Sequence, residues 1–184
     1  MTHALLVCGV LSPVLYAASD LLAGMQWSDY SFKDQTISEL GAIGAPTQAL
    51  FSILLVPTYL LFIAFGVGVW RAAFGWRNLR IAAGLLVLFG SIAITTGPFV
   101  AMYPRGFEQG IAGALHLIEG AVEMLILLAA MGCAAIALWR AFRLYTIATV
   151  AVMLIFGAWS ATDIPRIEAG LSTPWVGVEE RIYW

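Results

Sequence analysis

The sequence predicts an all-α membrane protein: a polytopic bundle of five transmembrane helices in a single domain, residues 1–184. Hydrophobic residues make up 61% of the chain and charged residues 11%, whereas soluble domains carry about 25% charged residues. The mean hydropathy is +0.91. A soluble fold of this length leaves too much of its surface exposed to hide so many apolar side chains. A lipid bilayer is therefore the expected solvent.

Five apolar stretches reach the roughly 20 residues that a helix needs to cross a bilayer. They cover residues 4–24, 47–70, 81–101, 113–139 and 144–163. The first is expected to remain in the protein, because no Lys or Arg precedes it as in a cleaved secretory signal. Pro13, Pro57 and Pro98 fall inside the first three stretches. Each removes one backbone hydrogen bond and favours a kink.

The positive charges predict the orientation of the bundle. Two of the loops, which lie at the same end, carry Arg71, Arg77, Arg80, Arg140 and Arg143. The two loops at the opposite end carry only Lys33 and Arg105. By the positive-inside rule, the arginine-bearing loops and the N-terminus are cytoplasmic. We therefore expect a multi-pass protein of the cell membrane, surrounded by membrane lipids.

Aromatic side chains stand near the ends of the predicted helices. They are Trp27, Tyr30, Trp70, Trp76 and Trp139. Tryptophan and tyrosine are enriched at the two membrane–water interfaces, so these residues are predicted to anchor the helix ends there.

The first outer loop contains a signal for a short amphipathic helix. Thr36 and Glu39 have the spacing of a capping box, in which each side chain bonds the backbone N–H of the other residue. Gly41 is a suitable residue to end the helix. Ile37 and Leu40 would share one face, directed toward the bilayer or the bundle. We expect this helix to lie over the outer mouth of the bundle.

Ionisable side chains from three of the predicted helices fall at a similar depth in the outer half of the membrane. They are Asp20, His116, Glu119, Glu123 and Asp163. Charged groups at such depth are costly and usually face the bundle interior or a wet cavity. The spacing of three and four residues places the histidine and both glutamates on one helix face. The sequence thus predicts an outward-open polar pocket, with supporting polar groups at Thr95, Thr96, Ser160 and Arg166.

Four segments of the chain resemble a known family. They are DQTISELGAIGAP at 34–46, HLIEG at 116–120, DIPR at 163–166 and GVEER at 177–181. Together they resemble the prokaryotic membrane proteins catalogued as domain of unknown function 998 (DUF998). The resemblance implies a six-helix membrane protein without an established activity. It supports the topology and implies no particular chemistry.

The sequence departs from that family pattern at its end. Family members continue after the Glu-Arg segment into a sixth helix, but here no apolar run follows Arg181. The two interpretations are a truncated chain and a five-helix protein. With five helices the C-terminus would lie outside, and one face of the bundle would need a second copy or a partner membrane subunit.

Three functional hypotheses follow from the predicted pocket. The first is a binding or transport protein that takes a small polar ligand, a lipid headgroup or a cation. The second is a membrane-embedded hydrolase in which His116, Glu119, Asp20 and Asp163 hold a metal that activates water. The third is an accessory or scaffold subunit, in which these groups only lock helix packing. No GxxxxGK[ST], GxSxG or HExxH motif is present, which favours binding over catalysis.

Neither a cofactor nor a nucleic-acid partner is predicted. Cys8 and Cys133 stand alone in apolar stretches, without a zinc-ligand spacing. His3 and His116 lie toward opposite membrane faces, which disfavours a haem held by two histidines. The net charge of −2 and the absence of a clustered basic segment argue against binding to nucleic acid.

Overall fold

The computed structural model describes residues 1–184, which form helices and no strand. Five helices are long and apolar enough to cross a membrane. They are α1 (Thr2–Gln26), α3 (Gln48–Ala72), α4 (Arg77–Thr96, continued by the 3-10 turn η1, Gly97–Phe99), α5 (Gly110–Ala137) and α6 (Arg140–Ala161). The short helices are α2 (Ile37–Leu40), α7 (Ile164–Glu168) and α8 (Val176–Tyr183). The all-helical class and the five predicted stretches are confirmed.

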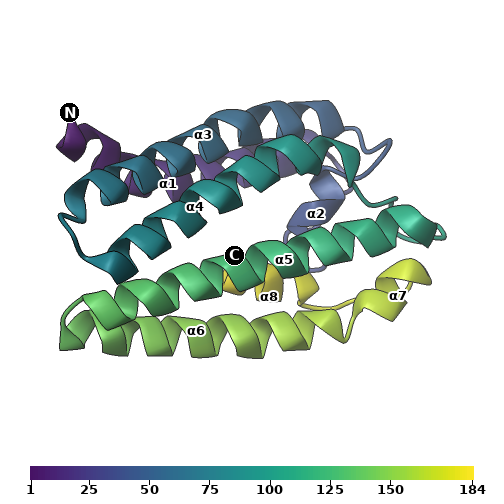
Figure 1. Cartoon of the computed structure of the whole chain (residues 1–184). Coiled ribbons are helices and arrows are strands. Elements are labelled where there is room, and N and C mark those ends of the chain that lie inside the picture. Colours follow the sequence, from purple (N-terminus) through teal and green to yellow (C-terminus); the bar gives the residue numbers. More distant parts are fainter.

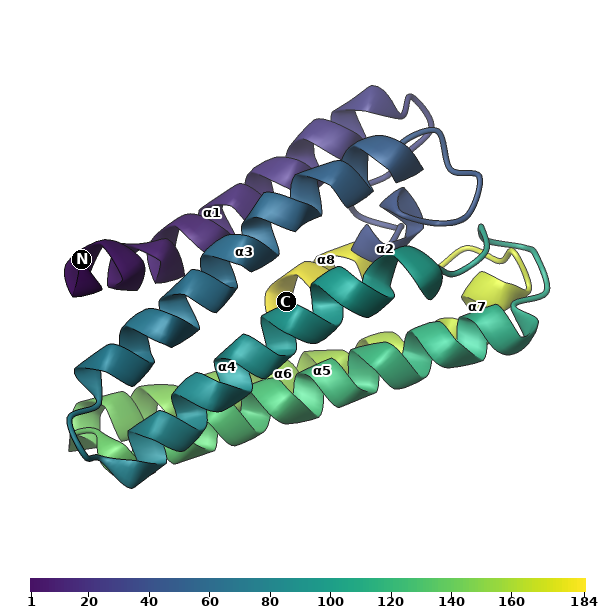
Figure 2. The same cartoon turned by 45° about the horizontal axis from the view of Figure 1, so that its top comes forward.

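The long helices pack on one another in chain order. α1 packs on α3, α3 on α4 and α4 on α5, whereas α5 and α6 share a smaller contact. The short helix α8 packs against α6 and touches α2, so that it lies between the two halves of the bundle (Figures 1 and 2). The N-terminus and the loops α3–α4 and α5–α6 lie at one end, and α2 and α7 at the other.

The outer surface of the bundle is apolar. Large side chains remain exposed on every long helix, among them Val10, Ile53, Leu88, Leu125 and Ile155. A bilayer solvates such a surface, and a helical span keeps its backbone polar groups satisfied within itself. The chain is therefore a multi-pass integral membrane protein.

The predicted aromatic anchors divide into two groups. Trp70, Trp76 and Trp139 are more than half exposed at the end of the bundle that carries the arginines, as an interfacial position requires. The prediction for Tyr30 is wrong, because it is buried and its hydroxyl donates a hydrogen bond of 2.8 Å to the Thr36 carbonyl. Trp27 packs beside it in a small apolar core. Burial removes Tyr30 from the interface, whereas Trp27 remains partly exposed.

Glycines bring α3 close to both of its neighbours. A Cβ atom on Gly68 would stand 2.8 Å from the Leu5 Cβ of α1. A Cβ atom on Gly66 would stand 2.8 Å from the Val87 Cγ2 of α4. Both distances are too short for a side chain, and small residues are what allows membrane helices to approach so closely.

The third span ends earlier than predicted. Regular α-helix stops at Thr96, and Pro98 lies in the turn η1 instead of inside the helix. A proline inside a helix removes a hydrogen bond, and its ring clashes with the carbonyl four residues earlier. Pro13 and Pro57, by contrast, lie inside α1 and α3 as predicted.

The capping box in the first outer loop is confirmed. The Thr36 hydroxyl accepts from the Glu39 N–H at 3.3 Å, and the Glu39 carboxylate accepts from the Thr36 N–H at 2.8 Å. Ile37 and Leu40 are almost fully buried, so the apolar face of α2 is directed toward the bundle and away from lipid.

The end of the chain lies inside the bundle, which differs from the expected outer position. The backbone turns at Trp175, which has a φ of 80°, and α8 then runs back between the spans (Figure 1). The Gly177 N–H donates to the Lys33 carbonyl at 3.0 Å, which joins α8 to the first outer loop. Because of this return, Trp184 comes to the middle of the bundle (Figure 1), where it remains 39% exposed.

Candidate functional site

A cavity of about 690 Å³ lies in the middle of the bundle. It is lined by 36 residues, 20 of them hydrophobic, that come from every long helix and from α2, α7 and α8. We call this space the bundle cavity. Its volume falls in the range of roughly 300–1,000 Å³ that is typical of small-molecule sites.

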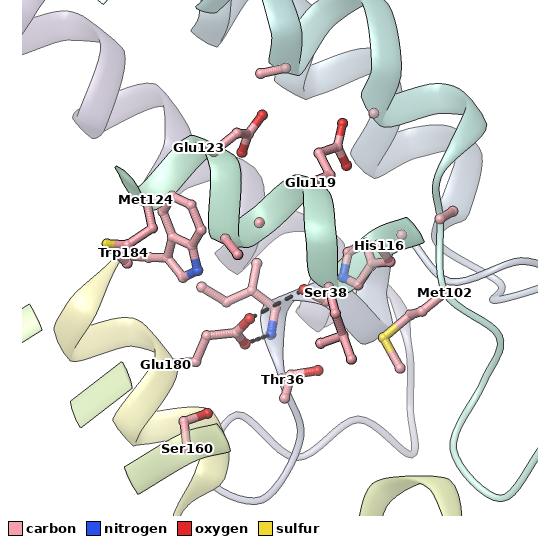
Figure 3. Close-up of a pocket in the computed structure, with 18 of the residues that line it drawn as sticks. Thr36, Ser38, Met102, His116, Glu119, Glu123, Met124, Ser160, Glu180 and Trp184 are labelled. Carbon is pink, nitrogen blue, oxygen red and sulfur yellow. Dashed lines mark hydrogen bonds between the residues drawn. The ribbon is translucent and has the colours of Figure 1, made fainter. Parts of the chain in front are cut away.

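His116, Glu119 and Glu123 all line the bundle cavity from α5. The helical spacing of three and four residues accounts for their common face. Figure 3 shows the two glutamates extending from α5 in the same direction, with the histidine one turn nearer the α2 end.

Glu119 has one partner in the protein. Its carboxylate accepts a hydrogen bond from the Thr96 hydroxyl, at the point where α4 ends. Thr96 was predicted as a supporting group and makes this contact. Thr95, predicted for the same role, is exposed and bonds the Ser91 carbonyl of its own helix at 2.7 Å.

Glu123 has no hydrogen-bond donor among the protein groups around it. It is 7% exposed and lines the bundle cavity, and its carboxylate extends from α5 beside that of Glu119 (Figure 3). Tyr59 of α3 lines the same cavity. A carboxylate that is removed from bulk water calls for a proton or a counter-charge.

His116 is held in place by the backbone. Its Nδ1 lies 3.1 Å from the Val100 carbonyl oxygen, in the segment between η1 and α5. A carbonyl can only accept, so Nδ1 carries the proton in this contact. The other ring nitrogen, Nε2, remains for a further interaction.

The structure does not bring Asp20 to the bundle cavity. Asp20 is 6% exposed and receives two hydrogen bonds from Arg181 of α8, Nε to Oδ2 at 2.8 Å and Nη2 to Oδ1 at 2.7 Å. Arg181 was not among the predicted site residues. The unbalanced charge of Asp20 was a signal for such a partner, but the two residues lie 161 positions apart and only the fold pairs them.

Asp163 also lies outside the set of cavity-lining residues. Its carboxylate stands 3.7 Å from Arg166, which is the pairing that the sequence suggested. Ser160, one turn earlier, is buried and does line the cavity. The predicted five-residue constellation is therefore divided: its α5 members share one space, and each aspartate has an arginine partner elsewhere.

A second buried ion pair fixes α2 over the outer end of the bundle. Arg105 donates to both carboxylate oxygens of Glu39 at 3.0 Å, and Glu39 is 1% exposed. The same guanidinium bonds the Asp34 carbonyl at 3.0 Å and the Thr173 hydroxyl at 2.7 Å. Glu39 was predicted only as half of a capping box. Its ion pair with Arg105 also joins three loop segments of the outer end.

Glu180 connects α8 to the start of α2. Its carboxylate accepts from the Ile37 N–H and, at 3.2 Å, from the Ser38 hydroxyl (Figure 3). Burial raises the pKa of Glu180 to about 7, against the opposing effects of the Ile37 hydrogen bond and the Arg181 charge. Glu180 also lines the bundle cavity, a position that the sequence did not indicate.

The four residues of the metal hypothesis, His116, Glu119, Asp20 and Asp163, are not assembled into one ligand set. No group of three or more His, Cys, Asp or Glu side chains is placed to hold a metal ion. The arrangement is instead that of an apolar chamber with a few acidic and aromatic polar groups.

The fold and the cavity together define a class: a polytopic helical membrane protein whose bundle encloses a mostly apolar chamber with a few acidic groups. A family model described as "Protein of unknown function (DUF998)" matches residues 10–184, nearly the whole chain. The chain belongs to this family, as the resemblance of its loop and helix segments predicted. No curated protein and no solved structure matches it.

Proposed function

We propose that this protein binds a small ligand in the bundle cavity, as a binding or transport protein does, and that Glu119 and Glu123 recognise the ligand's polar group. That group would be a cation or a hydrogen-bond donor, because ionised carboxylates only accept hydrogen bonds. The single observation that carries the proposal is Glu123, a buried carboxylate that faces an open chamber and has no donor from the protein.

Two further features support the proposal over a purely structural role for these acids. Neither Glu119 nor Glu123 forms an ion pair, whereas Asp20 and Asp163 both do. Glu119 has only the hydrogen bond from the Thr96 hydroxyl, and Glu123 has no partner in the protein. A group that only locks helix packing is expected to find its partner within the fold. The position of the chamber between membrane helices suits a ligand that enters from the outer side or from the bilayer.

The test uses thermal unfolding of the purified full chain in detergent. Sodium, calcium, choline and spermidine would be added separately, and a bound cation raises the melting temperature by mass action. We expect at least one of these cations to raise the melting temperature of the wild type and to leave that of the double variant Glu119→Gln/Glu123→Gln unchanged. Glu108→Gln, which changes an exposed carboxylate outside the cavity, is the matched control.

Equal shifts in the wild type and the double variant would remove both glutamates from the proposed site. If no cation shifts the melting temperature, uncharged hydrogen-bond donors remain as the possible ligands. The same comparison of the wild type and the double variant, made with uncharged polyols and amides, tests them. If they too had no effect, the proposed binding function would be wrong.

A further inference from the structure

We propose that the ligand of the bundle cavity is an amphiphilic organic cation, that is, a positively charged centre attached to an apolar body. This inference rests on the proposed function and narrows it to one ligand class. It depends on three properties of the cavity wall: its charge, its aromatic rings and its apolar area.

The charge on the wall has one sign. Four carboxyl groups line the cavity, those of Glu119, Glu123, Glu168 and Glu180, and no Lys or Arg lines it. Glu180 is occupied by its hydrogen bonds to α2, and Glu168 is exposed near the outer end. Glu119 and Glu123 are therefore the groups that remain to neutralise a cation in the interior, where anions would be repelled.

Aromatic rings stand around the same space. Tyr16 of α1, Tyr59 of α3 and both C-terminal aromatics, Tyr183 and Trp184, line the cavity. Tyr59 is set by an edge-to-face contact with Phe89, with ring centroids 6.1 Å apart. Aromatic faces attract alkylammonium and related cations, the more so where water is excluded. Rings beside carboxylates favour an organic cation over a hydrated inorganic one.

The rest of the wall is apolar, with 20 of 36 lining residues hydrophobic. A small inorganic cation would need several oxygen ligands at one point, and the cavity offers no cluster of three acidic or metal-ligating side chains. A bulky cation needs no such cluster, because its charge is spread and its body contacts side chains such as Met124 and Met153. Methionine is an adaptable lining for ligands of this kind.

The experiment measures equilibrium binding of labelled tetraphenylphosphonium to the full chain in phosphatidylcholine nanodiscs, after subtraction of binding to empty nanodiscs. Tetraphenylborate has the same shape and the opposite charge, so it separates charge recognition from apolar partition. We expect saturable binding of the phosphonium, none of the borate, and at least tenfold weaker phosphonium binding by Glu119→Gln/Glu123→Gln.

A second variant keeps the proposal testable if the double variant does not fold. Trp184→Leu changes a partly exposed ring at the end of α8, and we expect it to weaken phosphonium binding about fivefold, as for the loss of one cation–π contact. Trp139→Leu removes an exposed ring outside the cavity and should bind as the wild type does.

The outcomes separate this inference from the proposed function. Binding of the borate as tight as that of the phosphonium, or phosphonium binding that both cavity variants leave unchanged, overturns the inference. If choline or calcium binds in a glutamate-dependent manner and the phosphonium does not, the proposed function stands and the inference of an amphiphilic cation falls. If no cation binds in that manner, the inference falls, and the proposed function falls with it only if the uncharged polyols and amides also have no effect.

Discussion

The ion pair between Arg181 and Asp20 is the residue-scale contact on which the position of α8 depends. Both partners are largely buried, and the guanidinium also donates to the Tyr30 hydroxyl at 2.7 Å and the Phe32 carbonyl at 2.8 Å. Removing one partner of a buried pair leaves an uncompensated charge. Arg181 is therefore expected to be one of the most sensitive positions of the chain.

Arg181→Gln should lower the free energy of unfolding by about 3–5 kcal/mol, the usual cost of breaking a buried pair. Reversible unfolding in mixed micelles with increasing SDS would measure it. Asp20→Asn/Arg181→Gln, which removes both charges, should cost less than the sum of the single variants. Arg166→Gln breaks an exposed pair and should cost at most about 1 kcal/mol. Equal effects at positions 166 and 181 would contradict the importance of the buried pair.

Glu180 should make stability depend on pH. Burial raises its pKa from 4.5 to about 7 in the folded protein, so the fold retains a proton that the unfolded chain releases. The resulting stabilisation is complete below about pH 4.5 and is lost as the pH rises to about 7. At about 1.4 kcal/mol for each pKa unit, its size is of order 3 kcal/mol.

The measurement compares the unfolding free energies of the wild type and Glu180→Gln from about pH 4 to about pH 8. Glutamine resembles the protonated acid and still accepts from the Ile37 N–H. The wild type should lose stability relative to the variant as the pH rises to about 7, and the difference should then stay constant. Parallel curves across this range would contradict the role of Glu180.

At the scale of elements, the contacts of α3 with α1 and α4 depend on two glycines. Gly68→Ala places a methyl group 2.8 Å from Leu5 Cβ and 3.0 Å from the Leu5 carbonyl carbon, so the helices must separate. Overpacking of this kind costs about 1–3 kcal/mol. Gly66→Ala should have a similar effect against Val87.

Gly132→Ala is the matched control for these substitutions, because a Cβ there meets nothing within 4 Å. Alanine is the better helix former, so this variant should be as stable as the wild type or slightly more stable. Melting temperatures of the three purified variants test the expectation. A loss at Gly132 as large as that at Gly68 would mean that helix approach does not explain the glycines.

At the scale of the whole molecule, the helix ends that carry the arginines, on either side of the connections α3–α4 and α5–α6, share one end of the bundle with the N-terminus (Figure 2). This arrangement is the one from which we predict a cytoplasmic N-terminus. The prediction can be tested with single cysteines in a background where Cys8 and Cys133 are replaced by alanine.

Glu108→Cys should react with a membrane-impermeant maleimide in intact cells, because the loop before α5 is expected to face outward. Asn78→Cys, at the opposite end of the bundle, should react only after the membrane is permeabilised. The reverse pattern would show that the orientation is inverted. Labelling of both sites after solubilisation confirms that each cysteine is accessible.

The sequence by itself determined the membrane class, the five spans, the capping box at Thr36 and Glu39, and the common face of His116, Glu119 and Glu123. These features follow from local rules: the hydrophobic length of a span, the hydrogen bonds of a helix start, and the 3.6-residue helical period. Each of these features depends on residues that are close together in the chain and not on distant contacts.

Only the tertiary structure decided which charged groups meet when they lie far apart in the chain. Arg181 takes Asp20 as its partner and Arg105 takes Glu39, and the return of α8 into the bundle brings Glu180 and Trp184 to the cavity. A charge buried away from water pairs with whatever opposite charge the packing places beside it, at any separation along the chain. Helical period and span length carry no information about that choice, because it depends on how the helices pack.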